Sequence, residues 1–284
     1  MKHQHLNYAM LLRVIGGLLA MEAIFMLIPF VTSLIYGERH DALVFGLVAA
    51  ATAVAGLSMT RILKVHTTRF GKRESYLLTG SVWMVFSFCG MLPFIFGTSH
   101  LGVSDSFFEA MSGFTTTGAT IREVGAPSLS HGLMMWQAVM QWLGGMGIIL
   151  FTLAVIPALN SSGGMQMFNA EVPGITHDKI MPRISQTAMS LWGIYASLTL
   201  IMTVLLWLGP MDFFDSVCHA MGTMSTGGFS SHPDSVSGYN SDYVTVIVTL
   251  FMFLGGVSFT LIFNYGIFIK ILRCMCNVCT RIST

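Results

Sequence analysis

Apolar residues fill long stretches of the chain, and short polar segments interrupt them. Runs long enough to cross a bilayer, about 20 residues, fall near 8–36, 41–63, 75–98, 131–157, 186–209 and 242–272. We expect a membrane-spanning helix in each run. Two semi-apolar segments, near 104–113 and 214–223, are too short to cross, and we expect each to form a short helix.

Each short segment is followed directly by a run rich in Gly, Thr and Ser, which reads FTTTGAT in the first case and MSTGGFS in the second. These residues favour irregular backbone over helix. Irregular backbone survives at membrane depth only where it is buried in protein or lines a water-filled path. The sequence therefore predicts two re-entrant loops; the alternative is a pair of flexible loops outside the membrane.

The chain also repeats itself. DSFFEAMSGFTTTGAT, which begins at Asp105, aligns with DSVCHAMGTMSTGGFS, which begins at Asp215, and QWLGGMGIILF at 141 aligns with MFLGGVSFTLIF at 252. Each copy consists of a span, a short helix, a Gly/Thr loop and a second span. We therefore divide the chain into residues 1–72, with two additional spans and a basic loop, a first repeat at 73–160, and a second repeat with the tail at 161–284.

Composition supports a membrane location. Of the 284 residues, 54% are hydrophobic and 10% are charged, whereas a soluble domain carries about 25% charged residues. We interpret the chain as an all-α, multi-pass membrane protein in contact with the lipid bilayer. Nothing in it suggests a nucleic-acid surface, and no nucleophile–base pair or HExxH motif on a predicted span indicates an enzyme. Three of the five cysteines crowd the tail without a fourth ligand at metal-site spacing, and we interpret the cysteines as reduced thiols.

Charge predicts the orientation in the membrane. Basic residues cluster near the N-terminus, at 61–73, at 179–183 and in the tail. By the positive-inside rule, with six spans, these clusters and both termini lie in the cytoplasm. Acidic residues gather on the opposite side, where the two loops would enter. An acidic mouth suits a cation.

The loops have the composition that a dehydrated monovalent cation requires. Potassium channels replace the water of the ion with rings of backbone carbonyls, and Gly permits the backbone dihedrals that point carbonyls at one axis. We expect the selectivity filter to be formed by residues 115–119, the first loop, and residues 225–229, the second loop. Their members are Thr115, Thr116, Thr117, Gly118, Ala119, Ser225, Thr226, Gly227, Gly228 and Phe229. Both loops contain Thr-x-Gly-x, at Thr116 and at Thr226.

Other residues near the loops have expected roles. Each short helix would direct the partial negative charge of its C-terminal end toward the ion, and Asp105 and Asp215 would be its N-caps. Glu109 and His219 occupy equivalent positions, and two roles are open for Glu109: direct ion binding, or a hydrogen-bonding role behind the filter. Small residues let membrane helices pack closely, which favours packing over a hinge role for the glycines Gly144, Gly145, Gly147, Gly255 and Gly256.

At these motifs the chain resembles a family. SGFTTTGAT, STGGFS and WLGGMGI are similar to segments of TrkH-like potassium-uptake proteins of the Trk/Ktr/HKT superfamily, and the resemblance runs from about residue 5 to 272. It implies four membrane–pore-loop–membrane units around one ion path, preceded by two extra helices, with one key glycine per unit. These glycines would be Gly118 and Gly228. Because sodium-conducting plant relatives are associated with serine at the first of these positions, Gly118 is similar to the potassium-selecting version.

The resemblance also implies K⁺ as the transported substrate with no organic cofactor, the bacterial inner membrane as the location, and a TrkA-like cytosolic nucleotide-binding regulatory subunit as partner. Only two of the four units are present, so the C-terminal half of the family's pore is lacking. We expect either a truncated product of a longer gene or two copies that close a ring. The leading function is potassium uptake, channel-like or as a symporter; the alternative is a non-conducting membrane subunit that binds a partner chain.

Overall fold

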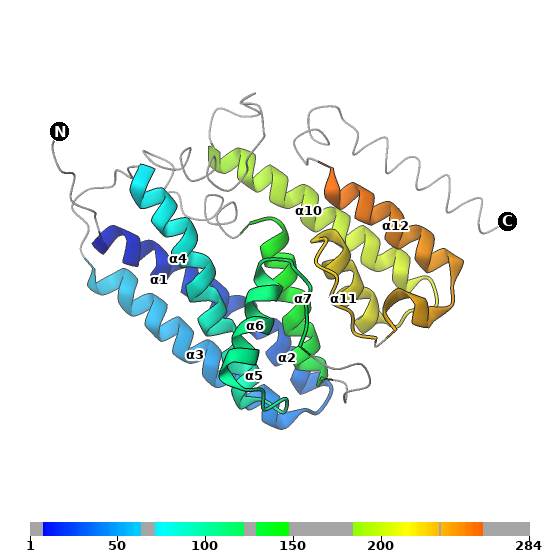
Figure 1. The fold of residues 1–284 in the computed structure, drawn as a ribbon, viewed down its shortest axis with the longest axis horizontal. Helices are drawn as coiled ribbons and strands as arrows, with labels where there is room; N and C mark the ends of the chain where they lie inside the picture. The colour runs from blue at the N-terminus through cyan, green and yellow to red at the C-terminus, as the bar shows by residue number, and fades with distance from the viewer. Residues whose placement is uncertain (1–7, 64–71, 122–128, 148–183, 233, 258–284) are drawn as a thin grey trace.

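The computed structural model describes residues 8–63, 72–121, 129–147, 184–232 and 234–257, and every regular element among them is a helix (Figure 1). The elements follow the order α1 (Tyr8–Phe25), α2 (Leu27–Ile35), α3 (Arg39–Ile62), α4 (Lys72–Gly90), α5 (Leu92–Phe96), α6 (Val103–Phe114), α7 (His131–Gly145), α10 (Ile184–Trp207), α11 (Phe213–Met224), the 3₁₀ helix η2 (Ser235–Tyr239) and α12 (Asp242–Gly256).

Four of the expected spans are long and apolar enough to cross a membrane. They cover Tyr8–Ile35, Arg39–Ile62, Tyr76–Phe96 and Ala188–Trp207. The first includes α1 and α2, and the third includes most of α4 with α5. The other two expected spans, 131–157 and 242–272, begin as α7 and α12, each of 15 residues, but these helices end at Gly145 and Gly256, earlier than predicted, and the backbone leaves the helical path at Gly147, with φ of +70°, and at the extended Val257. The residues from 148 to 157 and from 258 to 272 lie outside the described part of the chain. The two short helices span 103–114 and 213–224, within one residue of their predicted bounds.

The first two spans form a hairpin held by a pair of glycines. A Cβ placed on Gly16 of α1 would lie 2.7 Å from the carbonyl oxygen of Gly56 in α3, and a Cβ on Gly56 would lie 2.5 Å from that of Gly16. Neither position has room for a side chain. The reciprocal contact lets the two helix backbones meet directly, as small residues do in membrane helix packing.

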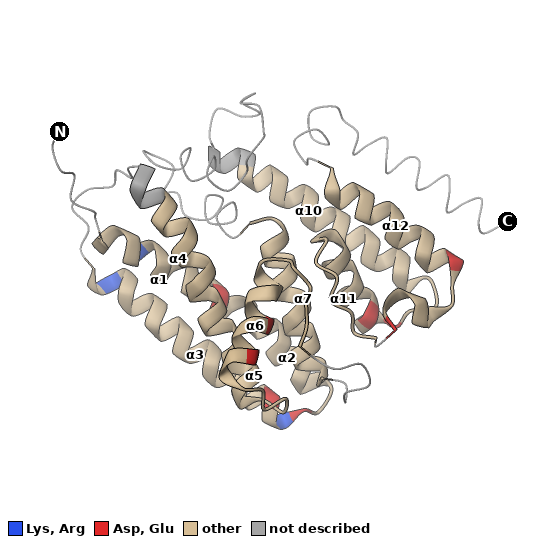
Figure 2. Cartoon of the chain, in the orientation of Figure 1, with Lys and Arg blue, Asp and Glu red and all other residues tan. Residues whose placement is uncertain are grey.

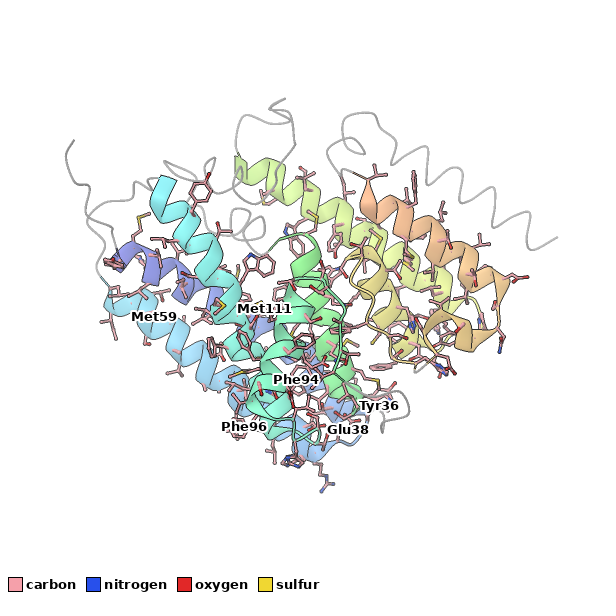
Figure 3. All side chains as sticks on the ribbon, in the orientation of Figure 1. Tyr36, Glu38, Met59, Phe94, Phe96 and Met111 are labelled. Atoms are coloured by element: carbon pink, nitrogen blue, oxygen red, sulfur yellow. The ribbon has the colours of Figure 1, made fainter. Side chains whose placement is uncertain are left out.

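The hairpin is joined to the first repeat at the N-terminal end of α7. The Glu38 carboxylate accepts hydrogen bonds from the backbone amides of His131, at 2.7 Å, and Gly132, at 3.0 Å. The first amides of a helix have no partner within the helix, so Glu38 satisfies two of them from 93 or more positions away in sequence. Tyr36 stacks on the His131 ring, with centroids 3.8 Å apart, and Figure 3 shows Tyr36 and Glu38 beside the start of α7.

A kink in the third span provides a second attachment for α7. Because Pro93 interrupts the helical hydrogen-bond pattern, the amide of Phe94 bonds to the carbonyl of Met91. The carbonyl of Gly90 instead accepts a hydrogen bond of 2.9 Å from the indole of Trp136, which is fully buried. Phe45, Phe114 and Trp136 meet edge to face in the core around this bond.

The two short helices lie against opposite sides of α7. Figure 1 shows α6 and α11 flanking it, and both contact it. On the side of the second repeat, the indole of Trp142 in α7 donates to the hydroxyl of Thr199, and the hydroxyl of Tyr195 in α10 donates to the Trp142 carbonyl. Helix α7 is therefore the element at which the two repeats meet.

Candidate ion-binding site

The two loops share an unusual backbone path. Thr116 and Thr226 both have φ of +54°, and two positions later Gly118 and Gly228 have φ of +69° and +91°. Glycine adopts such angles readily, whereas a β-branched residue with positive φ is a true outlier. The same alternation at positions 110 residues apart shows that the sequence repeat is also a repeat of backbone conformation. The sequence pattern did not reveal that the threonines share the strain.

The amides of the loops point back to the short helices. The amide of Thr117 donates to the Ser112 carbonyl and the equivalent amide of Gly227 donates to the Gly222 carbonyl, both at 2.9 Å. Among the described residues, no group donates a hydrogen bond to the carbonyls of the central loop positions, which are Thr116, Thr117, Gly118, Thr226, Gly227 and Gly228. These six carbonyl oxygens are the groups that could coordinate a cation.

The loops touch each other at Gly118. A Cβ placed on Gly118 would lie 1.8 Å from the carbonyl oxygen of Gly227 and 3.4 Å from the Cα of Gly228. Since the obstacle is backbone, no rotamer change could relieve it. Positive φ and this contact together restrict position 118 to glycine.

Behind the first loop lies the fully buried Glu109 of α6. One carboxylate oxygen accepts hydrogen bonds from the hydroxyl of Thr120, at 2.5 Å, and the amide of Ile121, at 2.9 Å. The other oxygen accepts a hydrogen bond of 3.1 Å from the side-chain amide of Gln137 in α7. Both oxygens therefore have protein partners, as a buried polar group requires. This arrangement favours the structural role for Glu109 over direct ion binding.

The second loop is supported by different side chains at equivalent places. His219 Nδ1 lies 2.9 Å from the Asp215 carbonyl and must donate to it, and Nε2 lies 3.0 Å from the Ser230 hydroxyl, which donates to the His232 carbonyl at 3.0 Å. Burial lowers the pKa of His219, although the bond to the Asp215 carbonyl opposes that effect. Burial and the Asp215 carboxylate raise the pKa of Tyr239, whose hydroxyl donates to that carboxylate at 2.6 Å.

The expected N-caps are wrong by three residues. The cap positions are Gly102 for α6 and Asp212 for α11, neither with a side-chain cap bond, while Asp105 and Asp215 lie in the first helical turn. There a carboxylate still interacts favourably with the helix dipole. Asp215 is engaged by Tyr239 and by the hydroxyl of Ser231, at 2.7 Å, and a loop that folds back over α11 brings both residues to it.

Of the glycines expected to pack closely, Gly144 and Gly255 pack against the ends of the short helices, whereas no described atom lies within 4 Å of a Cβ on Gly256. A Cβ on Gly144 would lie 1.9 Å from the carbonyl oxygen of Phe114, and one on Gly255 would lie 3.0 Å from that of Met224. Phe114 and Met224 are the last residues of α6 and α11. Close packing at both positions repeats between the two copies. Gly145 adds a contact between repeats, because its Cβ would lie 2.6 Å from the Cα of Ser225.

Two glutamine side chains on α7 were not predicted to support the loops. Gln137 and Gln141 lie one helical turn apart, and both are buried. Gln137 reaches Glu109 behind the first loop, and the Gln141 side-chain oxygen accepts a hydrogen bond from the Phe229 amide in the second loop. Two polar residues at i and i+4 in an otherwise apolar span were the available signal, because such residues are placed in membranes only where they find partners.

Charge surrounds the site unevenly. Acidic residues lie in the first turns of α3, α6, α11 and α12, at Asp41, Asp105, Asp215 and Asp242, and Arg61 lies in the last turn of α3. Figure 2 shows most acidic positions along the lower and right-hand sides of the view, with one basic position among them at the bottom and the other basic positions toward the far ends of α1 and α3. Among the described residues no group of three His, Cys, Asp or Glu side chains could hold a metal ion.

Comparison with known proteins decides the family. Residues 39–278 match the family TrkH, described as a cation transport protein. The chain belongs to the TrkH family. This confirms the resemblance carried by the loop motifs, and it places most of the chain, including both repeats, within the family's conserved extent.

Several relatives of this TrkH-family chain are known. It is 36% identical over 261 residues to the Trk system potassium uptake protein TrkH of Escherichia coli K12 and 35% identical over 261 residues to TrkI of Halomonas elongata. The crystal structure of the potassium transporter TrkH from Vibrio parahaemolyticus superposes with a TM-score of 0.76 at 32% sequence identity, covering 91% of this chain and 52% of the other. The chain spans about half the length of the relatives it matches.

These comparisons confirm the all-α membrane fold and agree with the prediction that the TrkH-family chain is not an enzyme, since the named relatives are transport proteins. The division at residues 72 and 160 and the filter roles of the loop residues stay predictions. Cys89 and Cys218 are free thiols, as expected, and the tail cysteines lie outside the described residues.

Proposed function

We propose that the chain contributes two of the ion-coordinating segments of a potassium-uptake path. Carbonyls of the first and second loops would replace the water of K⁺, chiefly those of Thr116, Thr117, Gly118, Thr226, Gly227 and Gly228. The observation that carries this proposal is the matched backbone of the loops, in which strained φ angles recur 110 residues apart and leave the same carbonyls without partners. Dipolar oxygens in a preformed cage are what a dehydrated K⁺ requires.

Electrostatics supports a cation rather than an anion. Helices α6 and α11 end directly at the two loops, so their C-terminal partial negative charges lie beside the open carbonyls. The named relatives are potassium uptake proteins, which favours K⁺ over other monovalent cations.

The finer parts of the proposal follow from the family and from the charge pattern of the sequence. The chain would lie in the bacterial inner membrane with both termini in the cytoplasm, because the basic clusters would then face inward. A TrkA-like nucleotide-binding subunit would be its cytosolic partner. Flux would be channel-like or coupled to a second ion, and the loops would serve either mode.

One observation favours the alternative of a membrane subunit that binds a further chain. Gly145 of α7 packs against Ser225 of the second repeat, whereas no atom of the described residues lies within 4 Å of a Cβ placed at the equivalent Gly256 of α12. Helix α7 uses the face around Gly145 to contact the second repeat. The equivalent face of α12, around Gly256, has no such neighbour among the described residues. A partner chain or a second copy could supply the missing neighbour, and the ion path would then be complete only in that assembly.

The test is rubidium uptake by this chain in cells that lack their own potassium-uptake systems. Gly118→Asp is the inactive control, because a side chain at 118 meets the carbonyl of Gly227. Gly80→Ala is the matched benign glycine change, since nothing lies within 4 Å of a Cβ there. We expect uptake by the wild type and by Gly80→Ala, and none by Gly118→Asp at equal membrane abundance. A well-inserted wild-type chain without uptake would reject conduction by this chain alone and support the partner-binding alternative.

A further inference from the structure

Gln141 reaches from the first repeat into the second loop. It is fully buried on α7, the helix that lies between α6 and α11 (Figure 1). Its side-chain oxygen accepts a hydrogen bond of 3.2 Å from the amide of Phe229, 88 positions away. The second loop thus depends for one of its backbone bonds on a residue of the other repeat.

The Gln141 side chain explains why position 227 is occupied by glycine, which the backbone conformation at that position does not explain. Gly227 does not belong to the positive-φ glycines of the described chain, so its dihedrals do not require glycine. A Cβ on Gly227 would, however, lie 2.4 Å from the Gln141 amide carbon and 2.7 Å from both the nitrogen and the oxygen of that amide. The Gln141 amide therefore rests flat against the Gly227 backbone and fills the volume that a side chain would take.

The first loop differs at the equivalent position. Thr117 stands where the second loop has Gly227, and its hydroxyl bonds to that of Thr115 at 2.8 Å. The first loop is thus braced by its own threonines and, further along, by Glu109 with Gln137. The second loop has no threonine at this position, and the Gln141 amide occupies the space beside Gly227 instead. Two amides one turn apart on a single helix therefore support both loops.

We propose that Gln141 is a positioning residue that fixes the carbonyls of Gly227 and Gly228 for ion coordination. This inference rests on the proposed function, because those carbonyls matter only if they bind the ion. The side-chain oxygen holds the Phe229 amide, and the body of the amide group sets the distance between α7 and Gly227. The side-chain nitrogen has no hydrogen-bond partner among the described residues. The side-chain oxygen is therefore the atom that holds the Phe229 amide.

The first test measures backbone amide exchange in the purified wild-type chain and its variants, by mass spectrometry of overlapping peptides across 225–230. Gln141→Leu removes the acceptor, and we expect the Phe229 amide to exchange about tenfold faster, the scale of one lost hydrogen bond. Gln141→Glu keeps an acceptor oxygen and should retain the wild-type rate. Gln137→Leu is the matched control, one turn away on the same helix, and should leave Phe229 unchanged.

A Phe229 amide that exchanges at the wild-type rate in Gln141→Leu, or equally fast in the Leu and Glu variants, overturns the positioning role. The second test is the ratio of rubidium to sodium uptake in the cells described above. We expect the ratio to fall several-fold in Gln141→Leu and to recover in Gln141→Glu at equal membrane abundance. An unchanged ratio in Gln141→Leu would reject a role in ion coordination. Absence of uptake by the wild type would reject conduction by this chain alone, while the exchange result would still decide whether Gln141 holds the loop.

Discussion

Gly118 and Gly228 occupy equivalent positions in the two loops, yet their surroundings differ. Both have positive φ, but a Cβ on Gly118 would collide with the carbonyl oxygen of Gly227, whereas nothing lies within 4 Å of one on Gly228. Alanine at 228 should therefore cost only the conformational strain, about 1–2 kcal/mol. Alanine at 118 adds a clash with backbone and must separate the two loops.

The expected result is a larger fall in the thermal unfolding midpoint for Gly118→Ala than for Gly228→Ala, measured on the purified chains. Rubidium uptake should be abolished by Gly118→Ala and only reduced by Gly228→Ala. Equal effects of the two variants would show that the contact between the loops does not exist in the membrane.

At the scale of elements, α6 and α11 are equivalent helices supported by different chemistry. Glu109 of α6 has hydrogen-bond partners on both oxygens, whereas His219 of α11 hydrogen-bonds to the Asp215 carbonyl through one ring nitrogen and to the Ser230 hydroxyl through the other. The surrounding charged groups are Asp215 and His232, but burial is the largest influence, and it lowers the pKa of His219 from its ordinary value of 6.5.

This difference predicts a pH dependence of stability. The unfolded chain binds a proton at His219 near pH 6.5 and the folded chain only at lower pH, so the free energy of unfolding falls as the pH drops below about 6.5. In His219→Gln, which cannot titrate, that part of the loss should be absent. Thermal unfolding midpoints of both proteins between pH 7.5 and about 5 test this. Parallel profiles would mean that His219 titrates alike in both states.

At the scale of the whole molecule, the seam between the repeats is built from one side only. Gly145 is packed against Ser225 and the Tyr195 hydroxyl, with a Cβ–oxygen distance of 2.7 Å, whereas the equivalent Gly256 has no neighbour within 4 Å among the described residues. Gly145→Ala should therefore push α7 away from α11 and lower the unfolding midpoint. Gly256→Ala should leave it unchanged in an isolated chain.

The mass of the purified particle, measured by light scattering, completes this prediction. A single-chain mass with an unaffected Gly256→Ala variant is the expected result if the wild type shows no rubidium uptake. A two-chain mass that Gly256→Ala converts to the mass of one chain would instead place a second copy on α12, and the ring of two copies would become the arrangement to pursue.

Much of the fold could be predicted because its causes are local. The spacing of apolar runs gave the helices at 8–35, 39–62 and 184–207, since a bilayer fixes the length of an apolar helix. The repeated loop motif led to the family and to Gly118 and Gly228, because few residues other than glycine accept positive φ. The prediction of Asp105 and Asp215 as N-caps was wrong because the cap position depends on where the chain turns into the helix. An acidic residue near the helix start does not specify that position.

The sequence by itself thus determined four of the apolar helices that are long enough to cross a membrane and the repeat of the two short helices with their loops, while the filter role of the loop residues stays a prediction. Only the tertiary structure decided how these parts support one another. Glu38 satisfies the start of α7, Trp136 takes the carbonyl released by the Pro93 kink, and Gln141 holds the Phe229 amide. The physical reason is that hydrogen bonds between residues far apart in sequence leave no periodic pattern. The length of an apolar span and the conformation of a glycine, in contrast, depend on the local sequence.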